Sequence, residues 1–417
     1  MDITTDVCVV GAGPAGLTLA LLMLRSGVRV TVVERARSFD REYRGEILQP
    51  GAMKLLDDLG VLVGARARGS YELGRFQLVE NERLLMNIDY GTLPPPYGFL
   101  LSLPQQHLLS ELFDACSRYP DFTYLDGCGL RELAGDGNAV TGIVCGQGER
   151  RRQITAPITV AADGRYSKTR RLAGIEQHRL EAFAHDILWF RVQSEDRRDR
   201  AVRVHRTDGA PVLIYDSYPD CVQIGWTLPH NGYREIAEKG VESLRTQIAR
   251  AVPGYADQVL EQIQDLSDLT LLDVFSGYAE EWAADGLVLI GDSAHTHSPI
   301  GAQGINLAVQ DAVLLHPVLI SALQTGGFSK TELSGWVPGR RKDIEKVFTL
   351  QARQSKAMLG GGGRIAGAIR PLAARALAHT PVYDKILRTI AFGDRPVTVR
   401  SDLFGEAEST RWGASGP

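Results

Sequence analysis

The sequence has few cysteines, little net charge and no long apolar run near its start. Its 417 residues include five cysteines without a C-x-x-C pair, and an odd number cannot close a disulfide framework. We therefore expect reduced thiols and a cytoplasmic location. The net charge of −4 is too small to indicate a nucleic-acid surface. The acidic start MDITTD is unlike a signal peptide, and the apolar run at residues 17–24 is too short for a bilayer, so we expect no transmembrane segment.

A metal site is also not expected. His295 and His297 have a spacing that metal ligands can adopt, but no cysteine, glutamate or third histidine lies near them in the sequence. The hydrophobic fraction of 44% and the charged fraction of 23% are ordinary for a globular protein, and the length suggests two or three domains.

A glycine-rich turn stands between a predicted strand and a predicted helix in DVCVVGAGPAGLTLALLMLRSGVRVTVVER. Gly11, Gly13 and Gly16 form G-x-G-x-x-G, which in this context predicts a dinucleotide cradle. Gly11 allows the tight turn, Gly13 lets a pyrophosphate approach the backbone, and Gly16 lets the helix pack on the strand. The N–H groups of the helix start, which includes Ala15, then point at the phosphates.

The next predicted strand ends at Glu34, whose carboxylate can accept hydrogen bonds from an adenosine ribose. Glu34 argues against a 2′-phosphate on the nucleotide bound here, and Arg35 can flank the adenine. This first motif does not choose between NAD and FAD.

A second cradle is predicted in GLVLIGDSAHTHSPIGAQGIN, almost three hundred residues later. Asp292 follows a buried strand, at the edge where ligands lie in an open α/β sheet, and can bind a sugar-like polyol. Pro299 shapes a turn, and Gly304, Ile305 and Asn306 begin a helix with unpaired N–H groups. Their partial positive charge suits a group that becomes anionic, as a flavin does on reduction. The two cradles together favour FAD over NAD.

A third stretch, AADGRYSKTRR, would by itself indicate only a turn at Asp163 and Gly164. In this order the three motifs, with Ser167 and Arg170 in the middle one, resemble the FAD-dependent aromatic hydroxylases. These are the single-component flavoprotein monooxygenases related to p-hydroxybenzoate hydroxylase. The resemblance covers residues 5 to 325, and the chain is similar to the short form without a C-terminal thioredoxin-like domain.

The resemblance implies further cofactor contacts. Arg44 would lie near the flavin, Gln105 would touch FAD, Leu130 would meet the adenine through its backbone, and Pro299 would lie beside the ring. Asp163 would belong to the same site.

The resemblance also implies the reaction. NADPH or NADH, bound transiently, reduces FAD, and O2 then gives a flavin C4a-hydroperoxide that hydroxylates an aromatic carbon. The flavin carries the chemistry, so no catalytic side chain is assigned.

The predicted fold is a Rossmann-like α/β FAD-binding domain interleaved with an antiparallel-sheet substrate domain and followed by C-terminal helices. Residues 1–75, 97–180 and 270–330 are expected in the FAD-binding domain, and residues 76–96 and 181–269 in the substrate domain. Residues 331–395 are expected to form helices and residues 396–417 a tail. Residues 50–61 and 104–119 predict helices, and residues 365–379 predict an amphipathic helix that packs on the catalytic domain rather than on a membrane.

The substrate domain is expected to cover the site. In VQIGWTLP, Val222, Ile224, Trp226 and Leu228 alternate with Gln223 and Thr227, but alternation does not say which face meets the pocket. The candidate substrate residues are Tyr215, Gln223 and Trp226, and the aromatic texture favours a bulky or polycyclic aromatic substrate of the kind found in secondary metabolism.

Other reactions on the same scaffold stay open. An epoxidase or a Baeyer–Villiger-type oxygenase is the main alternative. A flavin-dependent halogenase is less favoured because the W-x-W-x-I-P segment is absent, and a non-catalytic flavoprotein is also less favoured. Substrate identity, the position of oxygenation, the preferred nicotinamide and the oligomeric state are left undetermined.

Overall fold

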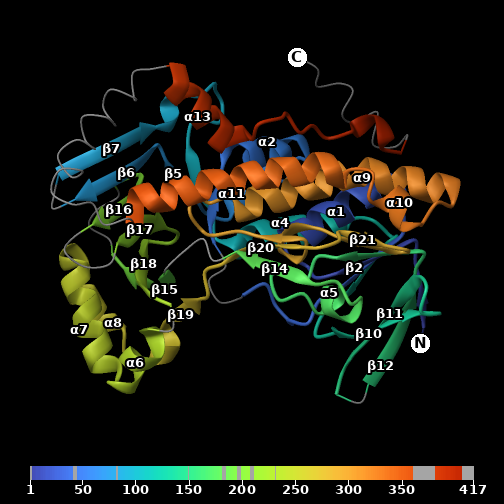
Figure 1. The fold of residues 1–417 in the computed structure, drawn as a ribbon, viewed down its shortest axis with the longest axis horizontal. Helices are drawn as coiled ribbons and strands as arrows, with labels where there is room; N and C mark the ends of the chain where they lie inside the picture. Colours follow the sequence, from blue (N-terminus) through green and yellow to red (C-terminus); the bar gives the residue numbers. More distant parts are fainter. Residues whose placement is uncertain are drawn as a thin grey trace.

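Two long helices, α9 (Gly304–Thr325) and α11 (Val337–Leu359), cross the middle of the molecule, between a parallel sheet at one end and a large mixed sheet at the other (Figure 1). The structure is a computed structural model that describes residues 2–40, 45–80, 83–148, 150–180, 185–194, 199–206, 211–230, 232–359 and 381–405.

The first sheet has six strands in the order β21-β22-β13-β2-β3-β9. Neighbouring strands pair in parallel, except that β21 runs antiparallel to β22. The central strands β13, β2 and β3 are completely buried and rich in valine, as expected for a parallel sheet covered on both faces. The strands are β21 (Ala283–Ala284), β22 (Leu287–Leu289), β13 (Ile158–Ala161), β2 (Val7–Val10), β3 (Val30–Val33) and β9 (Phe122–Leu125).

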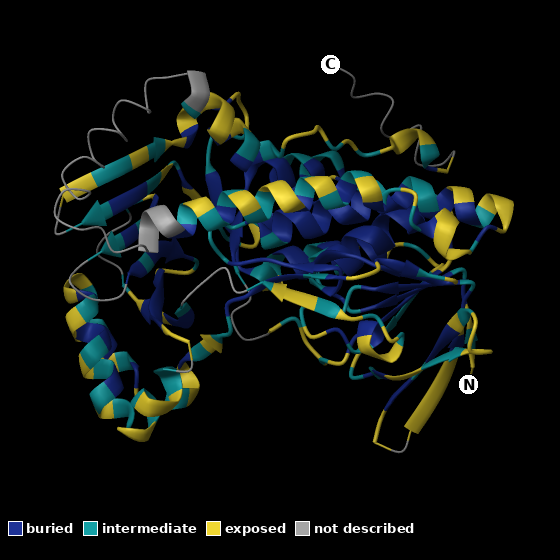
Figure 2. Cartoon of the chain, in the orientation of Figure 1, coloured by how far each residue is buried: buried dark blue, intermediate teal, exposed yellow. Residues whose placement is uncertain are grey.

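One apolar core joins this sheet to its helices. The helices that share it are α1 (Pro14–Arg25), α2 (Pro50–Asp58), α3 (Leu62–Ala67), α4 (Gln105–Cys116) and α9. The predicted helices at residues 50–61 and 104–119 are therefore confirmed as α2 and α4. In the described part of the chain, α9 alone is long and apolar enough to cross a membrane, but 72% of its apolar window is buried inside the fold (Figure 2).

The stretch QITAPITVA divides between two sheets. β12 (Arg150–Thr155) belongs to the sheet β1-β12-β11-β10, whereas β13 enters the parallel sheet. Pro157 separates the two strands, and its missing N–H interrupts the ladder there. The other strands of this sheet are β1 (Ile3–Thr4), β11 (Val140–Gln147) and β10 (Gly129–Gly135).

The second large sheet has seven strands in the order β19-β15-β18-β17-β16-β6-β7. They are β19 (Thr270–Leu272), β15 (His185–Gln193), β18 (Cys221–Pro229), β17 (Val212–Ser217), β16 (Ala201–Arg206), β6 (Arg75–Glu80) and β7 (Arg83–Asp89).

Two details of this sheet correct the sequence-based expectations. The sheet is mixed, because β16 pairs with β6 in parallel. β19 was expected in the FAD-binding domain but pairs with β15 here. Both differences arise from pairing between segments far apart in the sequence, which local patterns do not encode.

The two faces of this sheet pack against different partners. Its outer face packs under a helical cover, α6 (Gly232–Glu238), α7 (Val241–Ala251) and α8 (Ala256–Gln262). Its inner face shares an apolar cluster with α13 (Pro381–Phe392) and with Ile300 and Ala302, which directly precede α9. The inner face therefore meets the second predicted cradle.

Smaller elements complete the described fold. They are the sheet β14 (Gln177–Leu180)-β20 (Ser276–Ala279)-β23 (His295–Thr296), the sheet β4 (Ile47–Leu48)-β8 (Leu100–Ser102)-β5 (Tyr71–Leu73), and the helices α5 (Lys168–Leu172) and α10 (Lys330–Leu333). The amphipathic helix predicted at residues 365–379 lies outside the described residues.

We expect the outer face to depend on Ile248 of α7, which is fully buried against the sheet. Ile248→Ala should lower the free energy of unfolding by about 2–5 kcal/mol, because a cavity remains under α7. Leu260→Ala is the control, since Leu260 is 41% exposed. Urea unfolding measures both variants, and equal losses would contradict this packing.

Candidate active site

The predicted motifs meet at one edge of the parallel sheet. β22, β13, β2 and β3 are consecutive neighbours, and their carboxyl ends lead to Asp292, Asp163, Gly11 and Glu34. The two cradles also touch, because a Cβ added at Gly291 would lie 3.3 Å from the Cβ of Ala15 in α1. Residues almost three hundred positions apart therefore share the edge where ligands bind in open α/β sheets.

The three glycines of the first cradle have separate structural reasons. Gly11 has φ +107°, and a Cβ there would lie 2.4 Å from the carbonyl oxygen of Ala162. A Cβ at Gly16 would lie 2.0 Å from the carbonyl oxygen of Gly11, so no side chain fits between helix and strand. A Cβ at Gly13 would meet no protein atom within 4 Å. Gly11 and Gly16 are thus required by the fold, whereas at Gly13 the space next to the backbone is open.

Glu34 holds the first cradle in place. Its carboxylate accepts hydrogen bonds from the N–H groups of Ala12 and Ala36, each at 2.9 Å. A carboxylate has about four lone-pair positions, so capacity remains for further donors. Nearby, Arg35 is exposed, and its Cβ lies 3.7 Å from the position of a Cβ added at Gly129. The side chain of Leu130 is buried, and its carbonyl oxygen accepts from Lys168 Nζ at 3.0 Å.

Asp163 links the second and third motifs. One carboxylate oxygen accepts from Ser167 Oγ at 2.5 Å and from Ser293 Oγ at 3.2 Å. The other accepts from the N–H and the hydroxyl of Thr169, both at 2.9 Å. The N–H of Gly164 in turn donates to Ser293 Oγ at 3.1 Å. The carboxylate of Asp163 therefore accepts several hydrogen bonds from the protein itself. These bonds connect the turn at Asp163 to the turn at Asp292.

Asp292 has a more open setting. Its side chain is 30% exposed, and Arg165 Nε lies 3.7 Å from its Oδ2. Arg165 also donates to the carbonyl oxygen of Asp273 at 3.0 Å. Sequence reasoning missed Arg165, although a cation directly after the Asp163–Gly164 turn was a usable signal.

The loop before α9 is held from behind. The carbonyl oxygen of Gly301 accepts from Gln49 Nε2 at 2.7 Å, and the N–H of Ala302 donates to the carbonyl oxygen of Pro299 at 3.0 Å. Pro299 is half-buried, whereas Asn306 is buried and its Oδ1 has no hydrogen-bond partner among the described residues. These contacts fix the position of the loop that leads into α9.

Two uncapped helix starts define the ends of the site. α1 and α9 begin at this edge without a side-chain cap at Gly13 and Gln303, a feature that they share with α2, α4 and α7. The first N–H groups of a helix need outside acceptors, and a Cβ added at Gly304 would also meet nothing within 4 Å. An elongated ligand with acceptor groups at both ends fits this donor set, as a flavin dinucleotide does.

The remaining cofactor candidates lie as follows. Gln105 is the first residue of α4 and is half-buried. Ile305, the second residue of α9, is buried in the apolar core that α9 shares with the parallel sheet. Arg44 lies outside the described residues.

The structure separates the three substrate candidates. Tyr215 belongs to the inner-face cluster with Trp189, at 6.3 Å between ring centroids, and its strand register opposes Gln223. The structure corrects the prediction that Trp226 contacts substrate, because Trp226 belongs to the outer-face cluster beneath α7, with Ile248. Successive residues of β18 point to opposite sides, so Trp226 and Gln223 cannot share a face. Trp189, which was not among the candidate substrate residues, is the tryptophan on the inner face.

A buried acid, Glu46, also lies beside this sheet. Ser217 Oγ donates to its Oε2 at 2.7 Å, and the residue is 6% exposed. Burial raises the pKa of the Glu46 carboxyl, opposed by the Ser217 hydroxyl and by the charge of Arg191. Sequence reasoning missed it, although an acid between Gly45 and the apolar run that begins at Ile47 was a signal.

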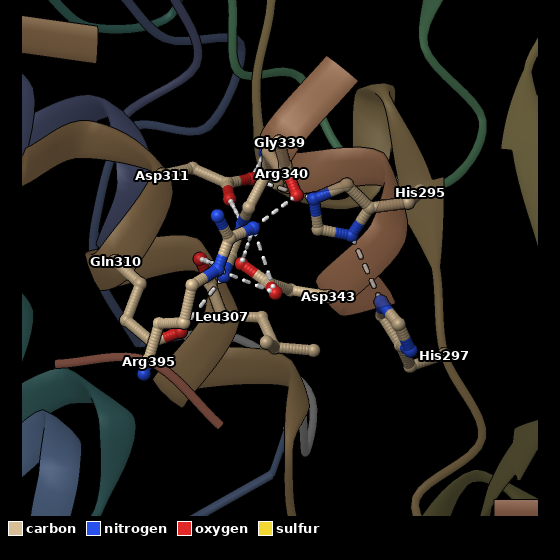
Figure 3. Close-up of polar contacts among 10 residues, drawn as sticks. His295, His297, Leu307, Gln310, Asp311, Gly339, Arg340, Asp343 and Arg395 are labelled. Carbon is tan, nitrogen blue, oxygen red and sulfur yellow. Dashed lines mark hydrogen bonds and ion pairs between the residues drawn. The ribbon is translucent and has the colours of Figure 1, made fainter. Parts of the chain in front are cut away.

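The two histidines near Asp292 serve a buried polar chain. His295 Nε2 lies 2.7 Å from Asp311 Oδ2, and His295 Nδ1 lies 2.8 Å from His297 Nε2 (Figure 3). Arg340 Nε donates to the other oxygen of Asp311 at 2.7 Å. The described residues include no cluster of His, Cys, Asp and Glu suited to a metal.

Comparison with known proteins agrees with this site. Residues 4–341 match the family described as FAD binding domain. The chain is 55% identical over 404 residues to 6-methylpretetramide 4-monooxygenase of Streptomyces rimosus, covering 97% of this chain and 96% of that protein. It is 27% identical to protoasukamycin 4-monooxygenase of Streptomyces nodosus subsp. asukaensis, covering 83% of this chain and 86% of that protein.

Solved structures share the fold. p-Nitrophenol 4-monooxygenase of Pseudomonas putida superposes with a TM-score of 0.78 at 20% identity, over 95% of this chain and 100% of that one. Anhydrotetracycline hydroxylase of Streptomyces rimosus has a TM-score of 0.74 at 22% identity, over 94% and 76%. A flavin-dependent brominase reaches 0.76 at 15% identity, over 99% and 100%, so the fold alone does not separate hydroxylation from halogenation.

The family match and the 55% identity show a flavin-dependent monooxygenase that uses FAD, with a nicotinamide as the reductant typical of its class. The chain belongs to the FAD-binding-domain family of aromatic hydroxylases. The class, the cofactor and the fold predicted from the three motifs are confirmed.

Gly13→Ala tests whether the open space at the first cradle is for the cofactor. The apoprotein should lose no more than about 1 kcal/mol, whereas FAD affinity should fall at least about tenfold, because the new methyl group occupies the ligand's side. Fluorescence titration of apoprotein with FAD measures the affinity.

Gly254→Ala is the matched control, since its added Cβ also meets nothing within 4 Å but the residue lies between α7 and α8. Equal FAD affinity in wild type and Gly13→Ala would place the phosphates elsewhere.

Glu46→Gln tests the buried acid. Because the pKa of Glu46 is raised in the folded protein, Glu46 ionises less readily there than in the unfolded chain. The resulting loss in free energy of unfolding grows as pH rises through the pKa of the unfolded chain. The variant should be more stable than wild type at about pH 8, with a smaller difference at about pH 5. Urea unfolding across this range measures it, with the exposed Glu261→Gln as control; a difference independent of pH would contradict the assignment.

Proposed function

We propose that this protein hydroxylates an aromatic ring of a polycyclic substrate of the 6-methylpretetramide kind, using FAD, NADPH or NADH, and O2. The single observation that carries the proposal is the 55% identity to 6-methylpretetramide 4-monooxygenase over 97% of this chain. Identity spread over the whole length includes the seven-stranded sheet as well as the cofactor motifs.

The cofactor roles proposed for individual residues rest on the contacts described above and, for Gln105 and Arg44, on the family resemblance alone. The start of α1 at Gly13 would hold the pyrophosphate, with Glu34 on the adenosine ribose and Arg35 and the backbone of Leu130 beside the adenine. Asp292 would hold the ribityl hydroxyls, since its side chain is 30% exposed. Asp163 would act indirectly, by fastening the turn that carries Asp292. Gln105 and Arg44 are proposed beside the phosphates and the ring edge.

The ring would lie on the loop from Pro299 to the start of α9. The N–H groups of Gly304, Ile305 and Asn306 have no intrahelical partners, and their partial charge stabilises a developing anion. When bound, FAD takes two electrons from the nicotinamide and activates O2 for transfer of one oxygen to an aromatic carbon. The protein's own contribution is to hold the ring, orient the substrate and exclude water.

The inner face of the seven-stranded sheet is the proposed substrate wall. Trp189 and Tyr215 belong to the same apolar cluster as Ile300 and Ala302, so the wall adjoins the ring loop. The indole of Trp189 lies against Gly225, where an added Cβ would be 2.7 Å from the ring. Aromatic side chains on this face suit a fused-ring substrate, and Gln223, which pairs with Tyr215 in the strand register, adds a polar group on the same face.

We also infer a cytoplasmic, reducing location, because all five cysteines are free and buried. The proposed division into FAD-binding, substrate and C-terminal helical parts follows the two large sheets, with residues 270–272 moved to the substrate part.

The decisive experiment measures NADPH and NADH oxidation by the purified yellow protein with and without 6-methylpretetramide. We expect the substrate to accelerate oxidation, O2 to be consumed, and the product to gain one oxygen as an aromatic hydroxyl. p-Nitrophenol is the comparison substrate, and it should stimulate less because it leaves most of the wall uncovered. An epoxide, an ester or a halogenated product would instead show epoxidation, Baeyer–Villiger oxygenation or halogenation. No stimulation by any polycyclic phenol would refute the proposal.

A further inference from the structure

A fully buried polar chain lies directly behind the loop that would hold the flavin ring. Its members come from three elements: His295 and His297 from β23 and the residues after it, Asp311 from α9, and Gln351 from α11 (Figure 3 shows the first three). Asp311, His295, His297 and Gln351 are all nearly inaccessible to water. The cofactor contacts proposed above use none of these side chains.

Gln351 connects the chain to the loop. Its Nε2 donates to the carbonyl oxygen of Ser298 at 3.0 Å and to that of Ile300 at 2.8 Å. Its orientation is therefore determined, with Oε1 on the other side of the amide. This Oε1 and His297 Nδ1 are both buried without a hydrogen-bond partner among the described residues. Gln351 nevertheless acts on His297, since its amide raises the pKa of the imidazole against the larger effect of burial.

Counting protons shows what the chain lacks. Asp311 Oδ2 at one end and Gln351 Oε1 at the other end can only accept. Two hydrogen bonds join Asp311, His295 and His297, and each needs one N–H. With one N–H on each imidazole both are made, and a hydrogen bond from His297 Nδ1 to Gln351 Oε1 needs one further proton. The two links that are made, at 2.7 and 2.8 Å, and the unpartnered Nδ1 of His297 agree with this count.

The surrounding charges keep the chain in this state at rest. The charged and titratable groups that act on His297 are His295, Asp311 and Arg340, and the last two form an ion pair at 2.7 Å. Burial first, and then His295, lower the pKa of His297 well below its ordinary value. Burial opposes ionisation of Asp311, but His295 and Arg340 hold the pKa of its carboxyl below the usual range. Burial, the largest effect, therefore disfavours a second proton on His297 at rest.

We propose that the chain Asp311–His295–His297–Gln351 takes up one proton when the flavin on the adjacent loop is reduced. The inference rests on the proposed function, which places that ring against residues 298–306. NADPH or NADH is oxidised by two electrons, the flavin is reduced, and the ring gains negative charge. A proton from solvent forms a new N–H bond at His297 Nδ1, directed at Gln351 Oε1, and no protein bond is broken. The completed chain then carries one positive charge, which stabilises the anion on the other side of the loop.

The test counts protons during anaerobic reduction by dithionite in weakly buffered solution with a pH indicator. His297→Gln keeps an amide donor for His295 but cannot be protonated. We expect wild type to take up about one proton more per FAD reduced than this variant, because protons bound differ by one between the two states of the chain. A second readout is the histidine ¹⁵N spectrum, in which reduction should convert one buried imidazole to imidazolium in wild type.

His316→Gln is the matched control. His316 is also buried on α9, its Nε2 contacts Ser26 Oγ at 2.8 Å, and burial lowers its pKa to about 4. This variant should take up as many protons as wild type. If His297→Gln does not retain FAD, Gln351→Met removes the acceptor at the loop end and should lower uptake in the same way.

Equal uptake by wild type and a flavin-loaded His297→Gln variant overturns the inference and leaves the proposed function intact. A wild-type protein that stays colourless with FAD instead removes the proposed function.

Discussion

The whole site depends on two helix starts that face one ligand space without side-chain caps. The parallel order of β22, β13, β2 and β3 brings their carboxyl ends to one edge, and α1 and α9 begin there. Unpaired N–H groups at a helix start are costly unless an acceptor meets them. In the proposed binding mode the cofactor supplies these acceptors, so the backbone geometry of the two helix starts favours an elongated anionic ligand.

The carboxylates at this edge of the parallel sheet have different roles. Glu34 and Asp163 bind backbone and hydroxyl donors of the protein, and so they shape the turns. Asp292 is the acid with the more open side chain, at 30% exposed. Asp311, fully buried, binds the N–H of Gly291 at 2.8 Å together with His295 and Arg340, and thereby ties the turn before Asp292 to α9 and α11. Rigid turns of this kind can hold a ring and a ribityl chain in fixed register, which the chemistry of a flavin monooxygenase requires.

Our proposal assigns substrate choice to the seven-stranded sheet. The seven-stranded sheet uses one face for the apolar packing of α7 and α8, and the other for Trp189, Tyr215 and Gln223. Relatives that act on different compounds, and one structural neighbour that is a brominase, retain the same overall fold. The architecture therefore does not determine reaction or substrate, and our proposal assigns both to side chains on this inner face and around the ring loop.

The class, the cofactor and the position of the main elements could be predicted from the sequence, because glycine spacing, strand and helix periodicity and the order of three motifs can be read along the chain. The alternation of residues in β18 also indicated two faces. It could not say that Gln223 faces inward and Trp226 outward, because the burial of each face depends on α7 and α13, which lie elsewhere in the chain. The parallel pairing of β16 with β6, the ion pair of Arg165 with Asp292, the burial of Glu46 and the chain from Asp311 to Gln351 likewise join segments that are distant in sequence. Such contacts are set by how whole elements pack, and no residue pattern within one element records them.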